Sequence, residues 1–366
     1  MFMGENYVFR DAVFARRIVE KISVLAVKTG GVRFCHVCGT HEWAIVHYGL
    51  RSLLPSEVEV IAGPGCPVCI VPAVEIDEAL LLAKKGVVVT CFGDVLRVPG
   101  SNSSLLEAKA LGADVRVVYS VSDAIDMAKK ESEKQFVFFA VGFETTAPLT
   151  AVEVLGGPPD NFSFLIAHRL IPPAMELLLN VEDLQINGFI APGHVSAIIG
   201  LTPYEMFPDR YKMPTVIGGF EPNDVLMSIY LLMQQISQNR TCLENEYSRI
   251  VKAEGNPKAL EAIRDVFNVS TGNWRGIGKL EKSALLFKDE FTRFNAKTKF
   301  NIQIAESIDI QQNCQCHRVI IGKIKPDQCP MFLKDCTPAK PVGACMVSNE
   351  GTCRVWAKTA NQYRQL

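Results

Sequence analysis

The stretch Val32-Arg-Phe-Cys-His-Val-Cys-Gly-Thr-His-Glu42 indicates how this chain folds. Its first six residues, with Val and Phe at alternate positions, are typical of a short buried strand. The Cys-Gly-Thr-His-Glu segment after them carries small and capping residues that can open a helix. The same succession of strand, polar loop and helix recurs along the chain. We therefore expect an α/β fold of mostly parallel sheet with helices on both faces.

Eight short segments have the apolar, β-rich composition of strands: residues 32–37, 58–62, 87–91, 115–119, 136–141, 162–167, 188–191 and 214–217. Most are followed by a loop marked by Gly or Pro and then by an apolar-periodic segment. Helices are also expected at residues 11–28, before Gly30 and Gly31, and at residues 256–267. Residues 279–299 are mixed and charged, and no element is assigned to them.

The loops after these strands are unusually rich in reactive side chains: Cys38, His41, Cys66, Cys69, Asp94, Glu144, His168, Arg169, His194 and Glu221. In open α/β sheets, ligands bind beyond the carboxyl ends of the strands. We therefore expect these loops to form a functional site, whatever its reaction.

We predict four parts of the chain. Residues 1–31 form an N-terminal helix that packs on the C-terminal domain. Residues 32–130 form an α/β domain with the CGTHE and CPVC loops, and residues 131–240 form a similar one with the GFETT and PGHVS loops. Pro-Gly before both Cys66 and His194 suggests this duplication, although such turns are common enough to match by chance. Residues 241–366 form a helical linker and a small Cys-rich iron–sulfur domain.

The composition excludes several classes of protein. The 366 residues are 48% hydrophobic and 21% charged, with a formal net charge of −1. A nucleic-acid partner is not expected without a basic surplus, and no apolar run is long enough for a membrane span. No signal peptide or phosphate-binding glycine loop is seen, so we expect a cytoplasmic protein without a tightly bound nucleotide. Because disulfides seldom persist there, the 12 cysteines are expected to be metal ligands or redox groups.

The late cysteines indicate a metal centre. The spacing Cys316-x12-Cys329-x6-Cys336-x16-Cys353 lacks the paired knuckles of a zinc ribbon, and Pro330 follows Cys329 directly. This arrangement favours a [4Fe–4S] cluster over a zinc-stapled tail. Two further thiols, Cys314 and Cys345, are left as reserve ligands or redox neighbours.

The early cysteines suggest different chemistry. Cys66-Pro-Val-Cys69 precedes a helix expected near Pro72. It can be a redox-active dithiol, half of a zinc knuckle, or a turn that contains cysteines by chance. Cys35 and Cys91 are expected within strands.

Cys38 would lie at a helix start, where backbone amides favour its thiolate, and His41 follows one turn on. This pair can form an iron or electrophile site, or the segment can be an ordinary cap. Glu144 can be an acid/base group or a partner of a ligand, or its loop can simply cap a helix. His194 can be a ligand or a hydrogen-bonded core histidine.

Taken together, the motifs resemble those of the HypD family of [NiFe]-hydrogenase maturation proteins. The resemblance covers nearly the whole chain and rests on the following segments: Cys38-Gly-Thr-His-Glu42, Gly63-Pro-Gly-Cys-Pro-Val-Cys69, Phe92-Gly-Asp94 with Arg97-Val-Pro-Gly100, Gly142-Phe-Glu-Thr-Thr146, Pro192-Gly-His-Val-Ser196, Gly219-Phe-Glu-Pro222 and Met346-Val-Ser-Asn-Glu-Gly-Thr-Cys353. The family often has Cys-Gly where this chain has Cys316-His317, and Cys314 lies close enough to compete as a ligand.

The resemblance implies a scaffold that assembles Fe(CN)2(CO) with a small HypC-type chaperone and a HypE-type cyanide donor. It implies that Cys38 holds the iron with a HypC cysteine and that Cys66 and Cys69 form the dithiol pair. It also implies a [4Fe–4S] cluster on four cysteines, Cys316, Cys329, Cys336 and Cys353. Further matching motif positions are His41, Asp94, Glu144, His194 and Glu350. The protein would be a redox-active scaffold rather than a conventional enzyme.

Two other functions remain open on the sequence. One is a disulfide reductase of the ferredoxin–thioredoxin reductase type, which the cysteines fit equally well. The other is a zinc-stabilised metabolic enzyme with an ordinary active site at the strand ends.

Overall fold

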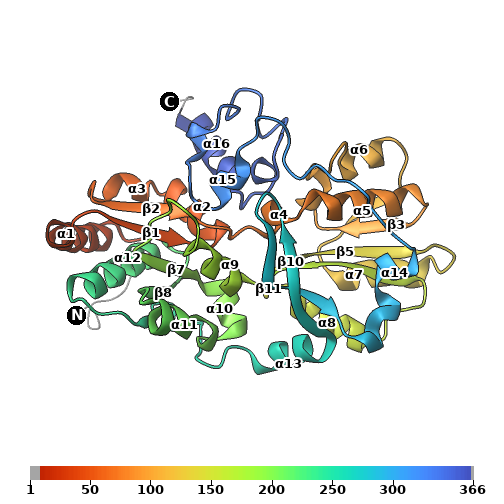
Figure 1. Ribbon diagram of the computed structural model, residues 1–366, viewed down its shortest axis with the longest axis horizontal. Coiled ribbons are helices and arrows are strands. Elements are labelled where there is room, and N and C mark those ends of the chain that lie inside the picture. Colours follow the sequence, from red (N-terminus) through yellow and green to blue (C-terminus); the bar gives the residue numbers. More distant parts are fainter. Residues whose placement is uncertain (1–8, 364–366) are drawn as a thin grey trace.

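Two parallel sheets form the core of the computed structural model, which describes residues 9–363 (Figure 1). The strands of the first, sheet A, follow the order β2 (Val58–Ala62), β1 (Val32–His36), β7 (Gly188–Pro192), β8 (Thr215–Gly218), β9 (Leu243–Asn245). Those of sheet B follow the order β4 (Val115–Val117), β3 (Val88–Cys91), β5 (Phe136–Gly142), β6 (Phe162–His168). All neighbouring strands within the two sheets are parallel. The expected α/β class with two parallel-sheet domains is confirmed.

The path of the chain differs from the predicted domain boundaries. β1 and β2 enter sheet A, the chain then forms all of sheet B, and β7 returns to pair with β1 at Phe34 and Gly188. The predicted division into residues 32–130 and 131–240 therefore does not hold. Local composition indicates where strands lie but not which strands pair. As a result, the loops with Cys38 and His194 follow neighbouring strands of one sheet.

Helix α1 (Ala12–Thr29) packs against α12 (Pro222–Ser237) on one face of sheet A (Figure 1). Phe14, Ile18 and Ile22 of α1 are buried in one core with residues of α12. Asp11 caps α1, as its Oδ1 accepts a hydrogen bond of 2.6 Å from Phe14 N. The helix is where we expected it, but its predicted packing on the C-terminal domain is not found. An apolar stripe identifies the buried face of a helix and not the partner of that face.

Ten further helices lie between β1 and α12: α2 (Gly39–His47), α3 (Leu50–Leu53), α4 (Pro67–Ile70), α5 (Ala73–Lys84), α6 (Leu105–Ala110), α7 (Val121–Lys130), α8 (Ala147–Leu155), α9 (Ile171–Leu178), α10 (Gly193–Ile199) and α11 (Thr202–Tyr211). A short 3-10 helix, η1 (Val95–Arg97), follows β3. One face of sheet B packs on α7 and α8, and the other shares a continuous core with sheet A. Cys35 and Cys91 lie buried in β1 and β3, as predicted.

An antiparallel hairpin, β10 (Phe267–Trp274) and β11 (Gly278–Phe287), was missed by the sequence analysis. It follows α13 (Pro257–Val266), which matches the predicted helix, and precedes η2 (Asp289–Phe294) and α14 (Ala296–Lys299). Many hairpin side chains are exposed, so its apolar signal is weak. The end of β10 is buried, however: Trp274 is fully buried and its Nε1 donates to Ser283 Oγ at 2.8 Å.

The Cys-rich C-terminal region lies above the junction of the two α/β domains (Figure 1). Its short helices are α15 (Cys316–Ile320), η3 (Pro326–Gln328) and η4 (Ala344–Met346), and it ends in α16 (Thr352–Tyr363). Its buried side chains belong to the same core as those of α4 and α5. The region therefore packs directly on the loops that follow β1 and β2.

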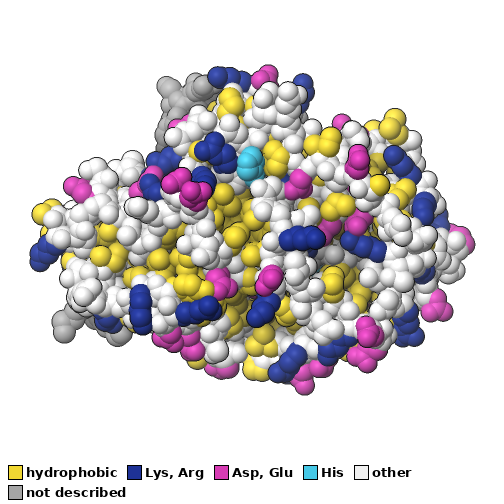
Figure 2. Space-filling model, viewed as in Figure 1, with side chains coloured by type: hydrophobic (Ala, Val, Ile, Leu, Met, Phe, Trp, Pro, Cys, Tyr) yellow, Lys and Arg dark blue, Asp and Glu magenta, His cyan; other side chains and the backbone are white. Residues whose placement is uncertain are grey.

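Within residues 9–363, no helix has both the length and the apolar character needed to cross a bilayer. On the face shown in Figure 2, basic and acidic side chains are interspersed, which agrees with a net charge of −1. No extended field of one sign is seen on that face.

Candidate functional site

The loop after β1 meets the loop after β2 at Gly65 and meets the C-terminal region at Gly39. Gly65 touches the backbone of Val37 and Cys38 so closely that a Cβ atom would overlap it. A Cβ atom on Gly39 would likewise overlap Glu350 of the C-terminal region. The glycines therefore allow three segments, far apart in sequence, to meet around Cys38.

Cys38 is buried at the start of α2. Burial, followed by the negative charge of Glu350, raises the pKa of its thiol to about 11. The backbone amides of Thr40 and His41 act in the opposite direction, as expected at a helix start. The expectation that the helix start leaves Cys38 as a thiolate is therefore not supported, because burial outweighs the amides.

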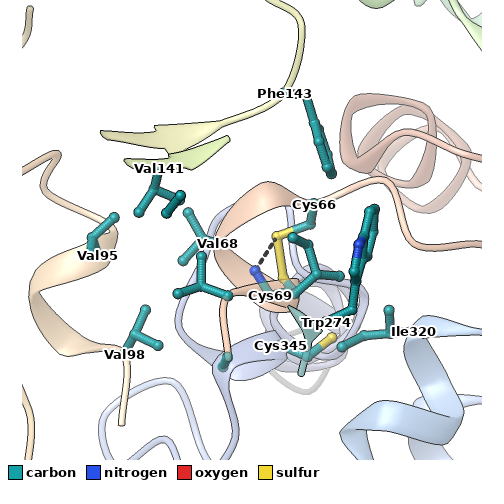
Figure 3. Packing of buried hydrophobic residues seen from close by; sticks show 14 of the residues in the cluster. Cys66, Val68, Cys69, Val95, Val98, Val141, Phe143, Trp274, Ile320 and Cys345 are labelled. Atoms are coloured by element: carbon teal, nitrogen blue, oxygen red, sulfur yellow. Dashed lines mark hydrogen bonds between the residues drawn. A yellow bond between two sulfur atoms is a disulfide. The ribbon is translucent and has the colours of Figure 1, made fainter. Parts of the chain in front are cut away.

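Cys66 and Cys69 are joined by a disulfide with a Cα–Cα distance of 5.3 Å. Cys66 caps α4, and its Sγ accepts a hydrogen bond of 3.2 Å from Cys69 N. Both sulfurs lie in a buried environment with Val68, Trp274 and Phe143 around them (Figure 3). The helix expected near Pro72 is α5, which begins at Ala73.

One small pocket connects the early cysteines with the C-terminal region. Its lining includes Cys38, Cys66, Cys69, Cys345 and Glu350. The pocket thus gathers the predicted iron ligand, the predicted redox pair and a late thiol. The sequence analysis expected the first three together and left Cys345 as a reserve ligand or a redox neighbour.

The two predicted site histidines lie on opposite sides of one aromatic ring. Phe220 stacks on His194 at 3.8 Å and on His41 at 4.7 Å between ring centroids. His41 Nε2 donates to the carbonyl oxygens of Gly218 and Gly219 at 3.2 and 2.9 Å. Nδ1 of this buried ring has no hydrogen-bond partner among the described residues.

Both rings favour the neutral form. Burial, then the charge of His36, lowers the pKa of His41 to about 3 despite its two carbonyl partners. Burial also lowers the pKa of His194, whose side chain is the more exposed of the two. A neutral His41 presents an unprotonated Nδ1, which is a hydrogen-bond acceptor and a potential metal ligand.

Asp94 docks the C-terminal region onto sheet B. Its Oδ2 accepts hydrogen bonds of 3.0 Å from Ser348 Oγ and 3.1 Å from Asn349 N. Burial, followed by the charge of Asp94, raises the pKa of Glu350. Asp94 therefore acts on the Cys38 pocket through the position and charge of Glu350, and does not line it.

Glu42, considered in the sequence only as a possible cap, is a buried hub of four hydrogen bonds. Its Oε2 accepts from His36 Nε2 at 2.8 Å and from Arg51 at 2.7 Å. Its Oε1 accepts from Arg51 at 3.2 Å and from Trp356 Nε1 of α16 at 2.6 Å. Although burial opposes ionisation, Arg51 and His36 hold the pKa of Glu42 well below its usual range. Glu42 therefore joins α2, which begins at the Cys38 loop, to the C-terminal helix.

Glu144 is buried after β5, away from the lining of the Cys38 pocket. Its Oε1 accepts a hydrogen bond of 2.9 Å from Ile171 N, while Oε2 has no hydrogen-bond partner among residues 9–363. Burial raises the pKa of Glu144 to about 7. Burial, followed by the charge of Glu144, raises the pKa of Tyr204, a fully buried residue that the sequence analysis did not single out.

We expect Glu144 to make folding stability depend on pH. A carboxyl group whose pKa is raised in the folded state stabilises it fully below the ordinary value of 4.5, and this contribution is lost as the pH rises through about 7. That loss corresponds to about 3 kcal/mol. Glu144→Gln should remove this part of the pH dependence. Denaturant unfolding of both proteins between pH 4.5 and 8 measures the difference.

Glu133→Gln provides the matched control, because Glu133 is exposed. Its unfolding free energy should follow the wild-type pH profile. A Glu144→Gln profile parallel to that of the wild type would show that Glu144 ionises normally.

The six C-terminal cysteines are all buried: Cys314, Cys316, Cys329, Cys336, Cys345 and Cys353. Hydrogen bonding with Cys345, then burial and the charges of neighbouring thiols, raises the pKa of Cys353. Cys336 Sγ accepts a hydrogen bond of 3.3 Å from Val342 N. Within residues 9–363, no group of three or more His, Cys, Asp or Glu side chains is arranged to hold a single metal ion.

This donor set fits a cysteine-ligated iron–sulfur cluster. Buried thiols that raise one another's pKa repel one another once they are deprotonated to thiolates. Bound iron removes that repulsion. Backbone amides directed at sulfur are a typical surrounding of such clusters. A Cβ atom on Gly343 would lie 2.7 Å from Cys314 Sγ and 3.0 Å from Cys316 Sγ, so both thiols lie beside the same backbone. Cys314 thus remains an alternative to Cys316 as a ligand.

Comparisons with known proteins agree over nearly the whole chain. The model of the HypD family, described as "Hydrogenase formation hypA family", matches residues 13–360. A protein of Methanocaldococcus jannaschii provisionally named hydrogenase expression/formation protein is 45% identical over 352 residues, which cover 95% of this chain and 98% of that protein. Hydrogenase maturation factor HypD2 of Bradyrhizobium diazoefficiens is 43% identical over 357 residues, 94% of each chain. Hydrogenase maturation factor HypD of Rhodobacter capsulatus is 40% identical over 361 residues, 95% of this chain and 96% of that protein.

Proposed function

Because this chain belongs to the HypD family of hydrogenase maturation factors, we propose that it is the scaffold on which the Fe(CN)2(CO) unit of [NiFe]-hydrogenases is assembled. The observation that carries the proposal is the pocket shared by the Cys38 thiol, the Cys66–Cys69 disulfide and the C-terminal region. In this proposal the pocket would bring a metal ligand and a two-electron group to one place.

In this proposal Cys38 binds the iron that is the cargo of the scaffold. Iron with cyanide and carbonyl ligands is soft, and a thiolate suits it. With its pKa raised to about 11, Cys38 holds its proton until the metal displaces it. His41 lies within the same first turn of α2, and its neutral ring has an unpartnered Nδ1. A cysteine of a HypC-type chaperone would complete the coordination.

Cys66 and Cys69 would supply electrons for cyanide release. A thiocyanate carried by a HypE-type donor takes up two electrons and two protons when its S–C bond breaks, which leaves a thiol and hydrogen cyanide. The reduced pair supplies both electrons and both protons as it closes to the disulfide. In this proposal the Cys66–Cys69 disulfide would be the product of that step.

Cys316, Cys329, Cys336 and Cys353 would hold a [4Fe–4S] cluster. Such a cluster supplies single electrons, which the dithiol can collect in pairs. The protein's own contribution is to bury these thiols and to pack η4 against α4.

A disulfide reductase of the ferredoxin–thioredoxin reductase type is the second candidate function. It is favoured by the closeness of the Cys66–Cys69 disulfide to late cysteines in one pocket. It gives no role to Cys38 or to the stacked histidines.

Anaerobic purification with the two partner proteins tests the proposal. We expect brown protein with iron at the level of one [4Fe–4S] cluster per chain, plus infrared bands of Fe–CN and Fe–CO. The cluster without those bands would favour the reductase. Zinc in place of iron would contradict both and would support a zinc-stabilised enzyme.

A further inference from the structure

Arg275 is a buried cation that the proposed function does not use. It follows Trp274 at the turn between β10 and β11, and it is 2% exposed. Taking a guanidinium out of water is unfavourable, and burial lowers the pKa of Arg275. A guanidinium nevertheless keeps its proton in proteins. The protein therefore holds a full positive charge in its interior, where solvent and salt screen it only weakly.

The guanidinium of Arg275 joins three segments of the chain through backbone carbonyls. Nε donates to Val71 O at 2.6 Å, Nη1 to Asp309 O at 3.0 Å and Nη2 to Pro99 O at 2.8 Å. The backbone N–H of Arg275 donates to Ile70 O, at the end of α4, at 2.8 Å. Carbonyl oxygens carry only partial charges, so these bonds hold the guanidinium in place without neutralising it.

The same turn packs against the first of the late cysteines. A Cβ atom on Gly276 would lie 2.3 Å from His317 Cβ, so the backbone beside Arg275 lies directly against the residue that follows Cys316. Burial has the largest effect on the pKa of Arg275, but negative charge on Cys316 and Cys314 opposes it. The contact and this attraction agree. Both place the buried cation beside the thiols that are proposed to bind the cluster.

We propose that Arg275 raises the reduction potential of the [4Fe–4S] cluster held by the late cysteines. Reduction adds one negative charge to such a cluster, and its potential depends on the charges around it. A cation fixed nearby in a medium of low dielectric constant stabilises the added charge. Asp309 limits the effect, because its negative charge also acts on Arg275. Its carboxylate oxygens accept hydrogen bonds from Ala73 N and Gly276 N.

The position of Arg275 connects this effect with the proposed electron path. Its backbone bond to Ile70 lies one residue beyond Cys69, so the same residue contacts the disulfide segment and the cluster region. A higher potential makes the cluster easier to reduce and a weaker donor to the Cys66–Cys69 pair. Arg275 thereby controls how far electrons pass from the cluster to the disulfide. This inference rests on the proposed cluster.

Arg275→Gln removes the charge and keeps a hydrogen-bond donor. Full-length protein is purified anaerobically with its cluster, and the midpoint potential is measured by mediated redox titration with electron paramagnetic resonance. We expect the equilibrium to shift about tenfold or more toward the oxidised cluster, which is a potential lower by about 59 mV or more. Arg275→Lys keeps the positive charge and should stay close to the wild-type potential. An unchanged potential in Arg275→Gln would overturn the proposal.

Arg318→Gln is the matched control. Arg318 lies two residues from Cys316, but its side chain is exposed. Because solvent and salt screen an exposed charge, its removal should change the redox equilibrium by less than about threefold. Equal shifts in Arg318→Gln and Arg275→Gln would contradict a special role of the buried cation.

Asp309→Asn tests the sign of the effect while Arg275 stays in place. Asparagine retains an oxygen that can accept from Ala73 N, but the charge that opposes Arg275 is lost. The potential should therefore rise, by about a threefold or greater change in the redox equilibrium. If Arg275→Gln does not retain its cluster, an unchanged or lower potential in Asp309→Asn would overturn the proposal. A wild-type protein without any iron–sulfur signal would instead contradict the proposed function.

Discussion

Replacement of Cys38 by alanine is expected to abolish the Fe–CN and Fe–CO infrared bands of the complex purified with its partner proteins. Even the loss of a group that only orients a metal ligand lowers affinity by about 10- to 100-fold, so loss of the ligand itself should exceed that. Hydrogenase activity in cells that depend on this protein should fall to background. The disulfide and the late cysteines do not need the Cys38 thiol, so the iron of the proposed [4Fe–4S] cluster should remain.

Cys35→Ala is the matched control. Cys35 is also buried, three residues earlier, but it lies within β1 and beside Gly63. Its removal should lower stability slightly through lost packing, with the infrared bands retained. Bands that persist in Cys38→Ala would show that iron is held elsewhere. Loss of bands in both variants would point to a general structural effect.

Replacement of Glu42 by alanine is expected to lower the free energy of unfolding by about 3–5 kcal/mol, because it leaves buried donors without their anion. Three elements lose their common partner: His36 of β1, Arg51 of α3 and Trp356 of α16. That loss is a large part of the roughly 5–15 kcal/mol that stabilises most proteins. Urea-induced unfolding at pH 7 measures it.

Trp356→Phe tests the hydrogen bond between Glu42 and the C-terminal helix separately from the other contacts of Glu42. It removes the 2.6 Å hydrogen bond from α16 and leaves the ion pair with Arg51 intact. It should cost about 1–2 kcal/mol. Proteolysis should then release the C-terminal region sooner than in the wild type. A Glu42→Ala protein as stable as the wild type would mean that the four contacts contribute nothing net.

The regular elements were largely predictable because they depend on neighbouring residues. All eight predicted strands are present, and the predicted helices before Gly30 and after Asn256 are found as α1 and α13. The missed hairpin has exposed faces and thus a weak periodic signal. The prediction of the domain boundaries was wrong for another reason. The pairing of β1 with β7 joins Phe34 to Gly188, and no local pattern encodes such a distant contact.

The candidate site was predictable in its residues but not in its arrangement. The motifs correctly placed reactive side chains at strand ends, where parallel sheets gather them. They did not separate Cys38, which lines the central pocket, from Glu144, which does not. Nor did they identify Phe220, whose ring lies between His41 and His194.

The sequence by itself determined the α/β class, the order of strands and helices, the family, and which thiols are available. These follow from side-chain periodicity, capping and chemical type, all of which are properties of short segments. Only the tertiary structure decided that Cys38 meets Glu350 and Cys345, more than 300 positions away. It also decided that burial, rather than the backbone amides at the helix start, has the larger effect on the pKa of the Cys38 thiol. Both depend on which surfaces pack together, and that complementarity is a property of the whole chain.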